Sequence, residues 1–250
     1  MMKKKAVILF TNSPETDVEL KASSAKSALK SLVKNCFTES ILHLYKKFSG
    51  NEYSLLVSSS ENSLFNYLQV EKDKTIVQKG STFGERFYNS INAAFNKGFD
   101  KVAIIGNDAT IIKNKRLLKA LKDTTDNIAC VGSSTNGGFY FLSLSQESFH
   151  NIPKQEFISL PYQTEIIYND LIKLFNYYLI EIKILEKKKY FDCSKALLVV
   201  QKIKNLQFDI RSEAIKNSFA TLIKNFRQNI FIVTNSLDFQ IAFHKAPPLR

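Results

Sequence analysis

The feature that most constrains the fold is an alternation between short apolar runs and longer segments whose apolar residues follow helical spacing. Ala6–Thr11 and Val102–Gly106 are typical of buried strands. Ser27–Phe48 and Thr82–Lys97 place their apolar side chains on one helical face. The same patterns predict further strands at Tyr53–Val57, Thr75–Gln78, Ile128–Gly132 and Phe139–Leu144, and helices at Arg116–Lys122 and Gln163–Tyr177. This alternation predicts a three-layer α/β/α fold around a mostly parallel central sheet.

The C-terminal third departs from this regularity. Leu179–Leu185 alternates apolar and charged residues, as a half-exposed strand does, so we expect a mixed rather than an all-parallel sheet. Ser194–Lys204 and Glu213–Phe226 have helical spacing. We therefore expect one domain over residues 1–198 and a helical extension over residues 199–250 packed on it.

Composition limits the classes of partner. The chain has 250 residues, 44% of them apolar, which is enough for one large core or two small ones. Its net charge of +12 permits an anionic partner. The excess is mostly scattered lysine, and no zinc-finger or RRM-type motif occurs, so we expect a solvated basic surface and no specific nucleic-acid partner.

The cysteines indicate the compartment. The chain has an odd number of cysteines, namely Cys36, Cys130 and Cys193, and no C-x-x-C pair. This pattern predicts a reduced, cytoplasmic protein. No stretch approaches the length of a transmembrane segment. The sequence does not indicate an oligomeric state.

Several common catalytic motifs are absent. Neither G-x-G-x-x-G after the first strand nor a P-loop occurs, which disfavours Rossmann dehydrogenases and P-loop NTPases. There is no G-x-S-x-G elbow, and the three histidines lie in unrelated contexts. No residue stands out as a general base, so the catalytic residues are unknown at this level.

Asn107 and Asp108 directly follow the apolar run that ends at Gly106. Ligands of open α/β sheets gather at the carboxyl ends of strands. Asp108 could hold a divalent cation that neutralises a diphosphate. A turn or helix cap after the strand explains the same residues equally well.

Two further segments have a structural and a functional interpretation. In Gly80–Arg86, Thr82 and Glu85 have capping-box spacing, but a glycine-preceded helix start can also bind phosphate, with Arg86 as an added contact. In Asn136–Phe139, Asn-Gly indicates a hairpin turn. Gly137 and Gly138 could equally let a ligand approach the backbone, with Asn136 offering its amide.

Together and in this order, these segments resemble the glycosyltransferase-like family of unknown function also called radical-SAM/selenodomain-associated transferases. The family pattern is approximately G-x-x-[LF]-G-E-R, I-G-x-D-x-P, D-G-G-[YF]-Y-L-[IL]-G-[LI], L-P-W-Q-T and D-I-D-T-x-x-D-L. The corresponding segments here are Gly80–Arg86, Ile105–Thr110, Asn136–Leu144, Leu160–Thr164 and Asp192–Leu197. The resemblance runs from Lys5 to Leu198.

The resemblance implies a GT-A-like fold and a glycosyl- or nucleotidyl-transferase that uses a nucleotide sugar or NTP and an unknown acceptor. It implies Mg²⁺ or Mn²⁺ as cofactor, with Asp108 and Asp192 as ligands. The residues it places at the nucleotide or substrate are Lys21, Gly84, Glu85, Arg86, Asn107, Asn136, Gly137 and Gly138.

Departures from the pattern support an alternative. Asn136 replaces the aspartate of the D-G-G segment, and Ser194 replaces the second acid of the late segment. The loop after the first strand keeps only Pro14 and Lys21 of the relatives' phosphate cradle, and adds acids that repel phosphate. The alternative is a catalytically degenerate binding or scaffold protein on the same fold.

Overall fold

The computed structural model describes residues 4–22, 34, 38, 41–50, 52–106 and 112–188. The chain divides into two compact units, residues 1–13 with 44–190 and residues 14–43 with 191–250. The first unit holds the sheet. Of the second, the structure describes mainly helix α1 (Pro14–Ala22). The predicted boundary between residues 198 and 199 lies outside the described residues.

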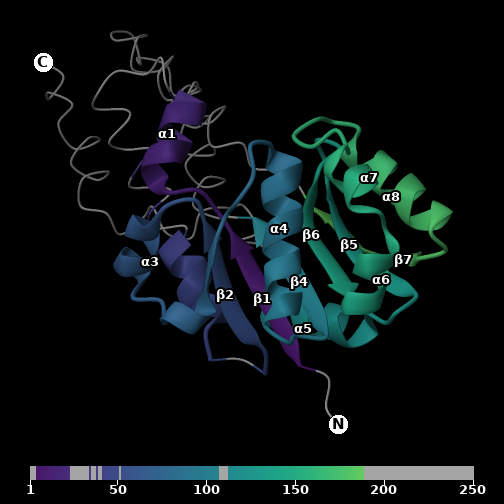
Figure 1. The fold of residues 1–250 in the computed structure, drawn as a ribbon, viewed down its shortest axis with the longest axis horizontal. Helices are drawn as coiled ribbons and strands as arrows, with labels where there is room; N and C mark the ends of the chain where they lie inside the picture. The colour runs from purple at the N-terminus through teal and green to yellow at the C-terminus, as the bar shows by residue number, and fades with distance from the viewer. Residues whose placement is uncertain are drawn as a thin grey trace, which may run out of the picture. The chain divides into compact units, whose positions relative to one another are not determined.

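The first unit is built on a seven-stranded sheet in the order β3-β2-β1-β4-β6-β5-β7 (Figure 1). Its strands are β1 (Lys5–Phe10), β2 (Ser54–Ser59), β3 (Thr75–Val77), β4 (Lys101–Gly106), β5 (Ile128–Ser134), β6 (Phe139–Ser145) and β7 (Glu181–Lys188).

Six of the seven strands run in one direction. β1 pairs in parallel with β2 and β4, β2 with β3, and β5 with β7. β6 is antiparallel to both β4 and β5. The expected mixed, mostly parallel sheet is confirmed, but the reversed strand is β6, whereas the half-exposed β7 is parallel to its neighbour.

Helices cover both faces of the sheet. α4 (Phe83–Asn96), α6 (Gln146–Asn151), α7 (Lys154–Ile158) and α8 (Ile167–Tyr177) lie over one face, as Figure 1 shows. α5 (Asn114–Asp123) packs on the other face against β4 and β5. α3 (Asn62–Leu68) packs on β2, and a 3₁₀ turn, η1 (Lys72–Lys74), leads into β3. The three-layer expectation is therefore confirmed.

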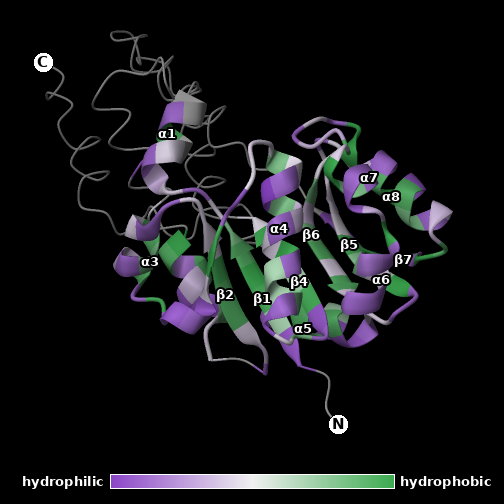
Figure 2. Ribbon diagram, in the orientation of Figure 1, coloured by the Kyte–Doolittle hydropathy of each residue, from purple (hydrophilic) through white to green (hydrophobic). Residues whose placement is uncertain are grey.

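The core beneath α4 combines strand and helix residues that the sequence pattern selects. Alternate residues of β1 and β4 contribute Ala6, Ile8, Val102 and Ile104, and the strands are the most apolar part of the ribbon (Figure 2). Phenylalanine supplies most of the large side chains from the helices: Phe87, Phe95, Phe149, Phe157 and Phe175. The abundance of phenylalanine is thus used for sheet–helix packing.

Two predicted helices have different outcomes. The helix predicted at Thr82–Lys97 forms as α4, and Gly98 adopts φ +85° just beyond its C-cap, as the glycine signal indicates. The helix predicted from Gln163 begins instead at Ile167, because Gln163 has φ +65°, which a right-handed helix does not allow. Among the described residues, no helix combines the length and apolarity that crossing a membrane requires.

Candidate functional site

The carboxyl ends of six strands meet at one edge of the sheet. The order of the strands changes direction at β1, which lies between β2 and β4, and such a switch point is where open α/β sheets bind ligands. α4 begins at this edge because it follows β3 after a short loop. The hairpin loop from Thr135 to Gly138 is at the same edge, because it follows β5 and precedes the reversed strand β6.

The N-terminus of α4 is closed by a complete capping box. Thr82 Oγ1 accepts a hydrogen bond from Glu85 N at 3.1 Å, and Glu85 Oε2 accepts one from Thr82 N at 3.1 Å. The same Glu85 oxygen also accepts from Ser81 N and Ser81 Oγ, each at 2.7 Å. These hydrogen bonds, that of the Ser81 hydroxyl first, lower the pKa of Glu85 to about 2. The capping interpretation therefore accounts for Glu85 without a ligand.

Arg86 follows the cap on the first turn of α4. Its Nη1 donates to the carbonyl oxygen of Ser81 at 3.3 Å. The described part of the chain places no carboxylate in an ion pair with this guanidinium. Arg86 is thus a cation at the carboxyl edge that is oriented by the loop preceding its helix.

Gly84 is required by packing against the last residue of α7 and the segment that follows it. A Cβ at position 84 would lie 2.3 Å from the carbonyl oxygen of Ile158 and 2.9 Å from Cε2 of Tyr162. The Tyr162 ring packs on Phe83 and Phe87, with centroids 5.3 and 5.6 Å away. Tyr162 Oη donates to the carbonyl oxygen of Phe157 at 3.0 Å, and burial raises the pKa of this phenol well above its usual value.

Position 137 requires glycine as strictly as position 84 does. It has φ +81°, and a Cβ at this position would lie 1.8 Å from the carbonyl oxygen of Glu165. The carbonyl oxygen of Gly137 also accepts a hydrogen bond from Tyr168 N at 3.1 Å. The expected Asn-Gly hairpin is confirmed, and its glycine is also a packing surface for the chain ahead of α8.

Asn136 orders the loop through its side-chain oxygen. Oδ1 accepts from Gly138 N at 3.2 Å and from the Ser134 hydroxyl. Because a backbone N–H can only donate, this contact identifies the oxygen and leaves Nδ2 on the other side of the amide. None of the described residues accepts a hydrogen bond from Nδ2, and the side chain is exposed. The amide nitrogen is thus available to an incoming acceptor.

One segment joins these features. Residues 158–165, which we call the bridging segment, contact Gly84 through Ile158 and Tyr162, and Gly137 through Glu165. The structure therefore brings two groups of predicted site residues, the α4 start and the Gly137–Gly138 loop, into contact with one segment that includes Leu160–Thr164 of the family pattern. Sequence reasoning assigned no role to Tyr162, and only its place in the family pattern drew attention to it.

The remaining predicted residues cannot be placed in the site. Asn107, Asp108 and Asp192 lie outside the described residues, although Gly106 ends β4 at the carboxyl edge beside Phe10 of β1. Lys21 is on helix α1, in the second unit, and its side chain lies outside the described part. Across the described ranges, no three His, Cys, Asp or Glu side chains gather in an arrangement that could hold a metal ion.

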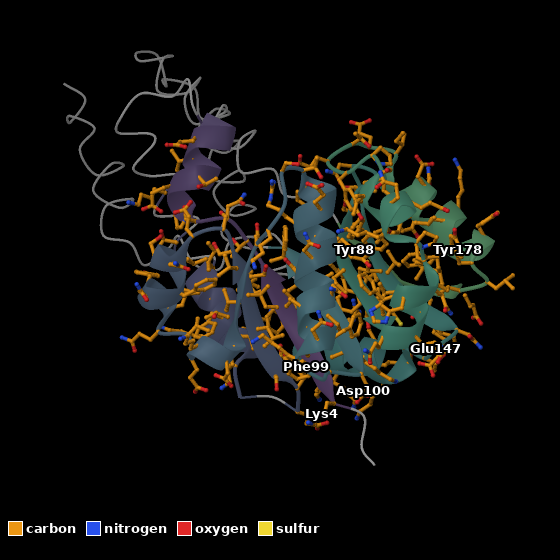
Figure 3. All side chains as sticks on the ribbon, viewed as in Figure 1. Lys4, Tyr88, Phe99, Asp100, Glu147 and Tyr178 are labelled. Carbon is orange, nitrogen blue, oxygen red and sulfur yellow. The ribbon has the colours of Figure 1, made fainter. Side chains whose placement is uncertain are left out.

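Two cavities in the described part of the chain lie outside the carboxyl-edge cluster, by which we mean the α4 start, the Asn136–Gly138 loop and the bridging segment. One of about 430 Å³ is lined by Asp100, Asp126, Glu147 and His150 at the opposite, amino edge of the sheet; Asp100 and Glu147 are labelled there in Figure 3. Another of about 360 Å³ lies between α5 and β7. Neither is lined by a residue of the carboxyl-edge cluster.

With this geometry established, known proteins provide a comparison. Residues 46–159 match the family described as "Uncharacterized protein conserved in bacteria (DUF2064)". The family resemblance is confirmed over these residues. The DUF2064 segment includes β2 to α7, and so contains the α4 start, Asn107, Asp108 and the Asn136–Gly138 loop. No curated protein matches the chain.

The chain is also similar to solved structures. That of a candidate nucleotide-diphospho-sugar transferase from Desulfovibrio desulfuricans G20 is similar with a TM-score of 0.66 at 17% identity, over 90% of this chain and 99% of that chain. A cytidylyltransferase from Leptospira borgpetersenii serovar Hardjo-bovis (strain JB197) has a TM-score of 0.42 at 13% identity, over 77% of each chain. The first likeness shows that the DUF2064 segment is part of a nucleotide-diphospho-sugar transferase-like α/β fold.

Proposed function

We propose that the protein is a metal-dependent glycosyl- or nucleotidyl-transferase that uses a nucleotide sugar or an NTP. The observation that carries the proposal is the meeting of the α4 start, the Asn136–Gly138 loop and the bridging segment at the carboxyl edge of the sheet. Open α/β sheets bind ligands at such an edge, and this fold is shared with a candidate nucleotide-diphospho-sugar transferase.

Within this proposal the described residues supply orientation and charge. Arg86 offers a cation for a phosphate group, and the Asn136 amide nitrogen offers a neutral donor. Glu85 holds the helix start in place instead of contacting substrate. Gly137 keeps the loop against the bridging segment, which fixes where Asn136 lies.

We assign Mg²⁺ or Mn²⁺ to Asp108 and Asp192, neither of which belongs to the described residues. The described part provides no substitute set of ligands, and two carboxylates suit a cation that takes its other ligands from water and substrate phosphates. When bound, the ion would neutralise charge on the diphosphate. Asp108 is the residue on which this assignment depends most.

The deciding experiment is calorimetric titration of UDP-glucose, GDP-mannose, CTP and ATP with Mn²⁺ into the full chain. We expect binding of at least one ligand that disappears without the metal and in Asp108→Ala. Asp73→Ala, which removes an exposed acid before β3, is the matched control and should bind as the wild type does. Failure of all four ligands to bind would overturn the proposal.

A second candidate is a binding protein on this fold without turnover. The observation that favours it is Asn136, whose oxygen is used inside the loop at the position where the family pattern has an aspartate. Metal-dependent binding without product formation would support this candidate. Restored turnover in Asn136→Asp would locate the loss of activity at this loop.

A further inference from the structure

Gln163 stands apart from the other residues with strained backbone. Three described non-glycine residues have positive φ: Gln69 at +52°, Gln163 at +65° and Leu179 at +57°. Gln69 is the C-cap of α3, and Leu179 follows the C-cap of α8. Helix ends commonly use this conformation. Gln163 ends no helix, because α7 stops at Ile158 and α8 begins at Ile167.

Two contacts hold Gln163 in its conformation, one on each side. The preceding residue, Tyr162, is fixed by the aromatic rings of Phe83 and Phe87 and by its hydrogen bond to Phe157. Two residues later, the carbonyl oxygen of Glu165 lies against Gly137. The strained residue is therefore fixed between the contact of Tyr162 with Gly84 and that of Glu165 with Gly137. Such strain persists only where the surroundings determine it.

The side chain of Gln163 is left free by this arrangement. It is exposed, and its amide hydrogen-bonds with none of the residues that the structure describes. An amide offers both a donor and an acceptor, and a hydroxyl group also donates and accepts. A phosphate group, which only accepts, is matched better by Arg86 than by an uncharged amide.

We propose that Gln163 recognises the hydroxyl-bearing sugar of a nucleotide-sugar substrate. The inference rests on the proposed function and adds the residue that distinguishes a nucleotide sugar from the corresponding nucleoside diphosphate. The bridging segment is then the sugar-side wall of the site. Its fixed backbone presents the side chain without a backbone ordering cost at each binding event, so only the rotamers of the glutamine have to be ordered.

The test uses Gln163→Gly, which removes the amide and relieves the strain at once. Calorimetry with UDP-glucose and UDP, and with GDP-mannose and GDP, is run in Mn²⁺ on the full chain. We expect about five- to tenfold weaker binding of the nucleotide sugar, the effect of one lost hydrogen bond. Binding of the nucleoside diphosphate should be unchanged, and the Tm should be equal to or above that of the wild type.

Two variants separate this role from a purely structural one. Gln69→Gly relieves the same kind of strain at the opposite edge of the sheet and should leave both affinities unchanged. Gln163→Asn keeps an amide in a residue that tolerates positive φ, and should recover part of the sugar-dependent affinity. Equal binding of the nucleotide sugar by wild type and Gln163→Gly would overturn this inference alone. Absence of nucleotide binding by the wild type would overturn the proposed function with it.

Discussion

The carbonyl oxygen of Glu165 occupies the space that a side chain at Gly137 would need, 1.8 Å from the Cβ position. The hairpin loop and the bridging segment are therefore in backbone contact, with no side chain between them.

Gly137→Ala should lower the free energy of unfolding by about 2–4 kcal/mol, because positive φ and a clash with backbone act together. Urea unfolding measures the change. Gly98→Ala is the matched control: its φ is +85°, but nothing lies within 4 Å of its Cβ position. The control should lose only about 1 kcal/mol from backbone strain. Equal losses in the two variants would mean that the contact with Glu165 is not tight.

Glu85 should make the stability of the α4 start dependent on pH. Its pKa falls from 4.5 to about 2 on folding, so its contribution is complete above pH 4.5 and is lost as the pH falls toward 2. Glu85→Gln keeps an acceptor oxygen without the charge. We expect its Tm to be below that of the wild type at neutral pH and to converge with it in acid. A Tm difference that persists unchanged at pH about 2 would contradict the carboxylate's role.

Tyr162→Phe should reduce the free energy of unfolding by about 1 kcal/mol, since the carbonyl oxygen of Phe157 loses one of its donors in a partly buried environment. Tyr67→Phe is the comparison, because Tyr67 is 53% exposed and should tolerate the change. Chemical denaturation of both variants measures the difference. A loss of similar size at both positions would show that the Tyr162 hydrogen bond does not contribute to the free energy of unfolding.

Leu179→Gly should stabilise the protein by about 0.5–1 kcal/mol. Leu179 has φ +57° and is 86% exposed, so the leucine adds backbone strain and little burial. Leu179→Ala removes most of the same side chain but keeps the Cβ. If strain is the cause, the Tm should rise in the glycine variant and stay near the wild-type value in the alanine variant.

Much of the fold could be predicted because the periodic spacing of apolar residues indicates which side chains are buried in a strand or a helix. The apolar run at Val102–Gly106 became a central strand, and the stripe on Thr82–Lys97 became the helix that covers it. The reversed direction of β6 had only a local signal, the Asn-Gly turn before it. The half-exposed pattern of β7 indicates an edge position and not a reversed direction.

The candidate site was less predictable, because contacts between distant segments leave no periodic signal. Gly84 and Gly137 stood out as glycines, but the partners that require them, Ile158 and Glu165, could not be found from spacing. The strain at Gln163 is likewise invisible in the sequence, which predicted a helix there. Capping at Thr82 and Glu85 could be predicted, since both partners are local.

The single reversed strand determines how long the connection between β5 and β6 at the candidate site has to be. A parallel return from β5 to its neighbour would require a crossover of a dozen or more residues, with its own cover for the sheet. Here the chain turns within residues 135–138 and goes straight back beside β4. The loop at the carboxyl edge is thus too short to change shape independently of the sheet. Under the proposed function, substrate selection then falls to segments such as the one that carries Gln163.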